Sequence, residues 1–234
     1  MSFRLRALTV IVYAAAMAYV ESAAVVYLQR AQSISPEHLF PLQSPQVLGN
    51  LAGIEVGREA ATLFMLATVG VLAGRHWLDR LAWSAVAFGI WDIGYYFWLW
   101  VFIGWPHSLA TWDVLFLIPV PWAGPVAAPV AVSLALIGFG LAAAWQVGRG
   151  RALRVSWPGV VLSLAGGFLV ILSFTLDVPD GLSDVPPPWH PWPIFLAGMA
   201  LAALAAAMTL RPGGESKTGG AAKTAESSRT SQSA

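Results

Sequence analysis

Five ionisable side chains stand inside long apolar stretches of this 234-residue chain: Glu21, Glu55, Arg58, Glu59 and Asp92. A charged group at the centre of a membrane helix costs about 2.5–3.5 kcal/mol on insertion scales, and less near a helix end. Such residues usually face a protein interior or a wet cavity and mark ligand, ion or proton sites. These five residues are therefore the candidate site.

Spacing places three of these residues on one helical face. Glu55 and Glu59 are four residues apart, and Arg58 follows Glu55 by three, so all three can be neighbours. Four acids then face a single arginine. Repulsion between carboxylates at low dielectric would force some of the acids to hold a proton or to bind a cation.

The depth of the acids in the membrane is the second indication that they form one site. A helix rises 1.5 Å per residue, so Glu21 and Glu59 lie roughly 10 Å inside the outer ends of their spans, and Asp92 lies roughly 16 Å inside. Three separate helices thus place acids in the outer half of the bilayer. Tyr95 and Tyr96 share a face with Asp92, and their hydroxyls need partners there.

The segment GWPHSLATWD at 104–113 is expected at the mouth of this cavity, with His107 and Asp113 on the outer surface. Carboxylates and an imidazole can together hold a divalent cation. The set that could do so is Glu21, Glu59, Asp92 and His107. His38 and His190 are expected on the same side of the membrane.

Six apolar runs are long enough to hold these residues in membrane helices, which need about 20 residues each. The chain is 57% hydrophobic and only 11% charged. The fold class expected is an all-α integral membrane bundle of six transmembrane helices over residues 1–211, followed by a disordered cytoplasmic tail at 212–234. The helices are expected at 6–28, 52–74, 81–103, 125–147, 157–176 and 194–210.

Basic residues give the orientation by the positive-inside rule. They gather before the first helix, between helices two and three, between helices four and five, and after helix six. The other three loops, at 29–51, 104–124 and 177–193, hold one basic residue, Arg30, and five acids. Both termini are therefore predicted in the cytoplasm.

Residues 111–123 (TWDVLFLIPVPWA) are too apolar for an ordinary loop and too short to span a bilayer. Several prolines in and after this stretch would interrupt a helix. The sequence predicts a re-entrant or interfacial segment leading into helix four. Backbone of that kind must be buried in protein or line a wet cavity.

The stretch WDIGYY followed by GWPHSLATWDVLFLIPVPWAGPVAAP resembles a pattern of an uncharacterised family of bacterial multi-pass membrane proteins. The resemblance covers about residues 55–132. It implies a bacterial inner membrane and, because that family has no known activity, no catalytic residue.

Composition excludes several kinds of chemistry. The chain has no cysteine, which removes disulfides, thiolate sites, iron–sulfur clusters and covalently attached haem. Both lysines, Lys217 and Lys223, lie in the tail, which excludes a retinal Schiff base in the membrane. A net charge of +1 gives no field for nucleic acid.

Several functions stay open. The cavity is expected to bind or process a lipid or a small polar ligand, with or without a divalent cation, so an enzyme is neither indicated nor excluded. The alternatives are a small proton- or cation-coupled transporter, an accessory subunit of a membrane complex, and acids that only hold the helices together. The sequence gives no oligomeric state.

Overall fold

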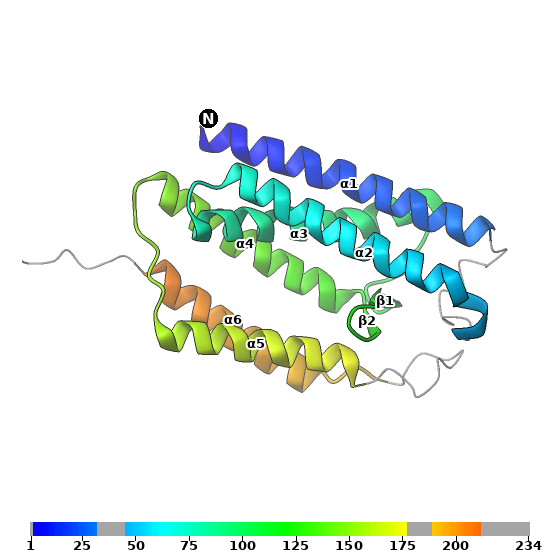
Figure 1. Cartoon of the computed structure of the whole chain (residues 1–234). Helices are drawn as coiled ribbons and strands as arrows, with labels where there is room; N and C mark the ends of the chain where they lie inside the picture. The colour runs from blue at the N-terminus through cyan, green and yellow to red at the C-terminus, as the bar shows by residue number, and fades with distance from the viewer. Residues whose placement is uncertain (1, 32–44, 177–188, 212–234) are drawn as a thin grey trace, which may run out of the picture.

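The computed structural model describes residues 2–31, 45–176 and 189–211 and contains six helices in that part of the chain. Four helices lie side by side, and the last two pack together beside them (Figure 1). The elements in chain order are α1 (Phe3–Ala31), α2 (Pro45–Ala73), α3 (Trp77–Ile103), β1 (Trp112–Phe116), β2 (Trp122–Pro125), α4 (Ala127–Gly148), α5 (Trp157–Thr175) and α6 (Trp192–Leu210).

Each helix is long and apolar enough to cross a membrane, as predicted. In each helix, between 17% and 39% of the most apolar 18-residue stretch is buried inside the protein. Most of these apolar residues therefore face outward. Apolar helices exposed on this scale are compatible with a multi-pass membrane protein. The predicted tail at 212–234 lies outside the described residues.

Two helices begin earlier than the sequence indicates. α2 begins at Pro45 rather than near residue 52, because the proline lies at its start, where it costs no helical hydrogen bond. α3 begins at Trp77 rather than near residue 81. Asp79 therefore lies in the first turn of α3 and not in the loop. Its carboxylate accepts a hydrogen bond from the backbone N–H of Arg75 (2.9 Å), and this contact stabilises the tight turn before the helix.

α3 is central to the bundle and packs against α1, α2 and α4. Glycines permit the close approach between α3 and α4. A Cβ atom at Gly89 would lie 2.6 Å from the Ser133 carbonyl oxygen, and one at Gly140 would lie 2.5 Å from the Ala82 carbonyl oxygen. The apolar core between the helices includes Val10, Ala14, Ala18, Leu66, Trp83, Val86 and Ala87.

A buried ion pair holds one end of the bundle. The guanidinium of Arg6 lies 3.2 Å from the carboxylate of Asp79, and the two residues are 5% and 0% exposed. Arg6 also donates to the Ala73 carbonyl oxygen (3.2 Å). These contacts fasten the start of α1 to the turn between α2 and α3.

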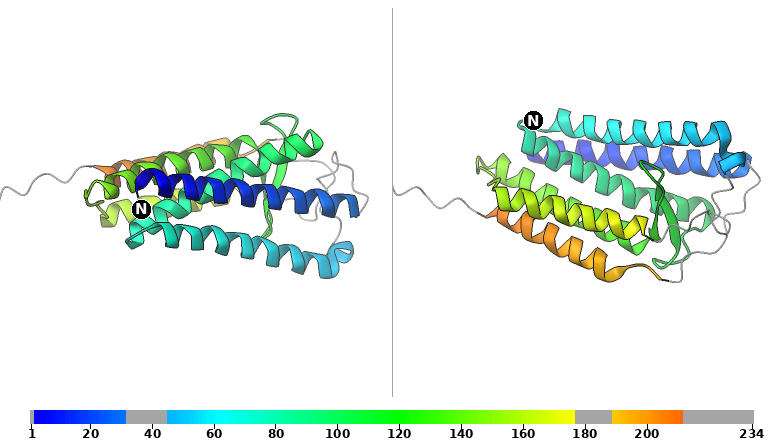
Figure 2. Two further views of the ribbon diagram at one scale, coloured as in Figure 1. Left: turned by 90° about the horizontal axis from the view of Figure 1, so that it is seen from above. Right: turned by 60° about the horizontal axis from the view of Figure 1, so that its bottom comes forward.

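The segment before α4 is an antiparallel β-hairpin, which the expected all-α fold did not include, and its re-entrant or interfacial position in the membrane stays a prediction. Trp112 pairs with Pro125, Asp113 with Gly124 and Val114 with Ala123, and the register then shifts before Phe116. The prolines at 119 and 121 lie in the connection between the strands, where they need donate no ladder hydrogen bond. The hairpin lies at the end of the bundle opposite the Arg6–Asp79 pair, which we call the hairpin end (Figure 2).

α5 and α6 form a closely packed pair. A Cβ at Gly166 would lie 2.7 Å from the Gly198 carbonyl oxygen, and one at Gly198 would lie 2.8 Å from the Gly166 carbonyl oxygen. The pair joins the rest of the bundle through α4 and β2. Small residues at such a crossing let two apolar helices approach without a hydrophobic driving force between them.

We predict that Gly166→Ala lowers the free energy of unfolding by about 1–3 kcal/mol, because the added methyl group meets backbone of α6 that cannot move aside. The matched control is Gly167→Ala, where an added Cβ meets nothing within 4 Å. That variant should be neutral or gain up to about 1 kcal/mol of helix propensity. Thermal unfolding in detergent measures both, and equal midpoints for the two variants would contradict the close crossing.

Candidate functional site

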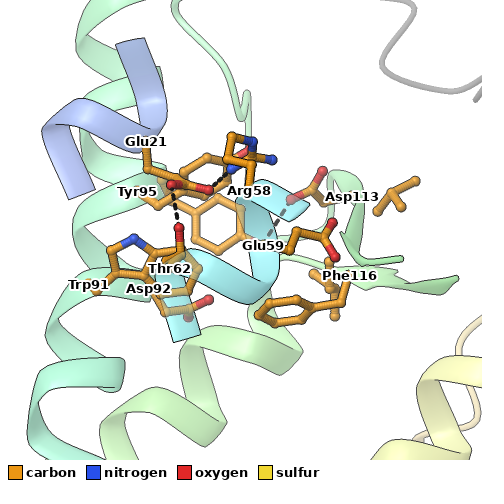
Figure 3. A pocket seen from close by; sticks show the side chains of 12 residues that line it. Glu21, Arg58, Glu59, Thr62, Trp91, Asp92, Tyr95, Asp113 and Phe116 are labelled. Carbon is orange, nitrogen blue, oxygen red and sulfur yellow. Dashed lines mark hydrogen bonds and ion pairs between the residues drawn. The ribbon is translucent and has the colours of Figure 1, made fainter. Parts of the chain in front are cut away.

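A cavity of about 60 Å³ lies at the hairpin end, between α1, α2, α3 and β1 (Figure 3). Such a space holds roughly four water-sized groups. The cavity is partly open to the outside. Its lining combines carboxylates with aromatic rings and consists of Glu21, Arg58, Glu59, Thr62, Trp91, Asp92, Tyr95, Tyr96, Asp113, Val114, Leu115 and Phe116.

Arg58 pairs with two glutamates on two helices. Its guanidinium donates to the Glu55 carboxylate one turn earlier on α2, at 2.9 and 2.7 Å, and forms an ion pair with Glu21 of α1. The second Glu21 oxygen accepts from the Thr62 hydroxyl (3.0 Å). The side chain of Arg58 is 27% exposed and that of Glu21 only 7%, so the arginine lies nearer the opening.

Glu59 has no such direct pairing. Its carboxylate accepts hydrogen bonds from the backbone N–H of Leu117, at 2.9 and 3.2 Å, and the residue is buried. Leu117 follows β1 directly, so this contact joins the hairpin to α2. A neutral N–H satisfies the carboxylate in part but supplies no positive charge.

Asp92 and Asp113 also have neutral donors. The Ser133 hydroxyl of α4 donates to Asp92 (2.7 Å), and the Tyr96 hydroxyl donates to Asp113 (3.0 Å). Both aspartates are buried, so the expectation of Asp113 on the outer surface is wrong: strand pairing in the hairpin directs it inward, against Tyr96. Three carboxyl groups from three elements therefore line the cavity without a direct partner cation among the described residues.

Burial raises the pKa of Asp113, on the hairpin, from 3.8 to about 7. The hydrogen bond from Tyr96 opposes this rise, because it favours the ionised carboxylate, and the nearby charge of Asp92 adds to it. Near neutral pH this group is therefore divided between its charged and its neutral form.

The structure brings together most residues of the predicted site. Glu21, Arg58, Glu59, Asp92, Tyr95, Tyr96 and Asp113 all line the one cavity. Glu55 is connected to it through Arg58. His107 is an exception, because it is exposed in the turn after α3 and does not line the cavity.

The predicted metal set is not assembled. Among the described residues, no three His, Asp or Glu side chains are grouped so that they could hold a metal ion. The reason is visible in the contacts: Glu21, Glu59 and Asp92 are each directed to a separate protein donor. His38 lies outside the described residues.

His190 is buried beside the hairpin, against Trp112 of β1. It is 2% exposed and lies among Trp112, Phe174, Trp192 and Phe195, with ring centroids 4.9–6.1 Å away. This burial lowers its pKa. His190 does not line the acid-rich cavity.

Sequence reasoning missed several lining residues. Trp91 lies one turn before Tyr95 and Thr62 one turn after Arg58, so helical spacing could have indicated both. Phe116 and the Leu117 N–H could not be found in this way, because they depend on a hairpin that was not predicted.

Comparison with protein family models, with curated proteins and with solved structures finds no match to this chain. The resemblance of residues 55–132 to bacterial membrane proteins therefore stays a prediction.

We predict that Asp113→Asn flattens the dependence of stability on pH. Because the pKa of Asp113 is about 7 in the folded protein and 3.8 ordinarily, its contribution to stability is full below about pH 4 and is lost as pH rises towards 7. Unfolding midpoints at several pH values should therefore fall more steeply for the unaltered protein than for the variant.

Two tyrosine variants provide a control for this prediction. Tyr96→Phe removes the hydrogen bond that lowers the pKa of Asp113, so the upper end of this pH window should move above 7. Tyr95→Phe leaves that hydrogen bond in place and should not move it. Identical pH profiles for the unaltered protein and Asp113→Asn would show that Asp113 is not buried as the structure places it.

Proposed function

We propose that this chain is a multi-pass protein of the bacterial inner membrane, with both termini in the cytoplasm, and that its cavity binds a small, positively charged polar ligand. Two observations support the orientation. Arg75 and Arg80 lie at the end of the bundle opposite the hairpin, as do the arginines between α4 and α5. The cavity is then in the outer half of the bilayer, within reach of the outer leaflet.

The excess of carboxyl groups at the site is the observation from which we infer that the ligand is positively charged. Five carboxyl groups, those of Glu21, Glu55, Glu59, Asp92 and Asp113, accompany the single guanidinium of Arg58, which pairs directly with only two of them. Several unpaired carboxylates in one apolar surrounding repel each other, so they must take up protons or a cation. A bound cation relieves that repulsion, which favours the binding of a positively charged ligand.

The geometry favours an organic cation over a divalent metal. A metal needs several oxygens within about 2.0–2.6 Å of one point, and the described residues offer no such group. An ammonium has three donors and can reach carboxylates that lie on different sides of it. Aromatic faces attract the same kind of charge, and Trp91, Tyr95, Tyr96 and Phe116 all line the cavity.

A carrier is the alternative, and it would need a polar path to the other end of the bundle. Between the cavity and the Arg6–Asp79 pair, the described helices are packed with apolar residues such as Val10, Ala14, Leu66 and Val86. This packing supports a binding site open to one side rather than a path through the protein.

Methylammonium and methanol test the proposal as a matched pair of ligands, because they differ in charge and little in size. At ten times its dissociation constant, a ligand that binds only the folded protein stabilises it by about 1.4 kcal/mol. We expect a rise in the unfolding midpoint with methylammonium chloride, and none with methanol or with sodium chloride at equal ionic strength.

The double variant Asp92→Asn/Asp113→Asn should weaken methylammonium binding by roughly tenfold or more, because it removes two acceptors of charge-assisted hydrogen bonds. Both amides keep an oxygen that can accept from Ser133 and Tyr96. Equal stabilisation of the variant and the unaltered protein would refute binding at this site.

A further inference from the structure

Three acids at the cavity lack a base as a direct partner. Glu59, Asp92 and Asp113 all line it, all are buried, and each accepts its hydrogen bond from a neutral donor. None of the three forms an ion pair with a base among the described residues. Carboxylates that share a cavity of about 60 Å³ repel each other, so in the absence of a cation some of them hold protons.

Asp113 changes its charge near neutral pH. It lies on β1, is 4% exposed, and accepts a hydrogen bond through its Oδ2 from the Tyr96 hydroxyl (3.0 Å). Burial, together with the charge of nearby Asp92, raises the pKa of Asp113 to about 7 despite that hydrogen bond. About half of the molecules therefore carry a proton on Asp113 at pH 7.

The described groups around Asp113 cannot supply its counterion. The other ionisable groups that line the cavity are Glu21 from α1, Arg58 and Glu59 from α2, and Asp92, Tyr95 and Tyr96 from α3. Arg58, the base in that set, is held by Glu21 and Glu55. The helices α4, α5 and α6 contain no ionisable side chain. His190, which precedes α6, packs against Trp112 of β1 and does not line the cavity (Figure 3).

A cation in the cavity changes this balance. A positive charge within about 4–6 Å of a carboxyl group favours its ionised form. The neutral Asp113 carboxyl then loses its O–H proton to solvent through the opening of the cavity, and the carboxylate that remains faces the cation. Entry of the cation and loss of the proton are therefore linked, because each favours the other.

We propose that the cavity exchanges a proton of Asp113 for its cationic ligand, so that binding is strongest above neutral pH and weakens as the pH falls. This inference rests on the function proposed above and adds the regulation of the same site by pH. The direction follows from the exchange: the bound state has the ionised carboxylate, so acid, which restores the neutral form, competes with the ligand.

Calorimetric titration of the purified full chain in detergent with methylammonium chloride tests this exchange. The ligand stays charged throughout, because alkylamines of the lysine type titrate at about pH 10.4. Buffers with different heats of ionisation should reveal the release of about half a proton per bound cation at pH 7, and roughly a tenth at pH 8. The affinity at pH 6 should be roughly tenfold lower than at pH 8.

The results separate this inference from the proposed function. Binding that releases no proton at pH 7 would overturn the exchange and leave the cation site in place. No binding at any pH would refute the proposed function and, with it, the exchange.

The variant Asp113→Asn should release no proton at pH 7, and its affinities at pH 6 and pH 8 should differ by less than about threefold. Its amide oxygen can still accept from Tyr96. Proton release that persists in this variant would show that another group titrates and would overturn the assignment. If this variant does not fold, Tyr96→Phe replaces it. Because Tyr96→Phe removes the hydrogen bond that favours the carboxylate, the midpoint of the pH dependence should rise, and an unchanged midpoint would contradict the exchange.

Two histidine variants are the matched controls, because imidazole is the other side chain that commonly changes its charge in this pH range. His190→Phe keeps a flat ring among the aromatic neighbours of that position, and His107→Gln alters an exposed turn. Neither residue lines the cavity, so both variants should keep the proton release and the tenfold ratio of affinities. Proton release that disappears in either variant would overturn the assignment to Asp113.

Discussion

The guanidinium of Arg58 is the contact on which the hairpin end of the bundle depends. It is the single base among five acids at this site, and it connects α1 to α2 by pairing with Glu21 while it holds Glu55. α1 and α2 otherwise have few contacts with each other. Because a base shared by two acids cannot neutralise the others, the remaining carboxyls need hydroxyl and backbone donors from α3, α4 and the hairpin.

Those donors come from segments far apart in the chain, so the acids find their partners only when the whole bundle has folded. Glu59 requires the N–H that follows β1, and Asp92 requires a hydroxyl from α4. The hairpin also contributes Asp113 and Phe116 to the walls. Charge balance and shape therefore depend on the same segments, because α1, α2, α3 and the hairpin supply both the lining of the cavity and most partners of its acids.

The helices and the acids could be predicted because each leaves a local trace: an apolar run of membrane length, or a charge that breaks one. Helical depth alone was enough to bring Glu21, Glu59 and Asp92 together. The hairpin left no such trace, since the apolar stretch before α4 has no regular alternation and its prolines indicated only that a helix stops. That His107 does not line the cavity could not be predicted for the same reason, because the path of the chain after α3 determines where it lies.

The buried pair at the opposite end has a consequence for biosynthesis. Arg6 belongs to α1, but its counterion, Asp79, belongs to α3, which is synthesised later. Until α3 follows, that guanidinium has no carboxylate to bind at this position. α1 and α2 therefore cannot complete their final packing as an isolated pair, and the nascent chain reaches its native arrangement at this end only once α3 has been made.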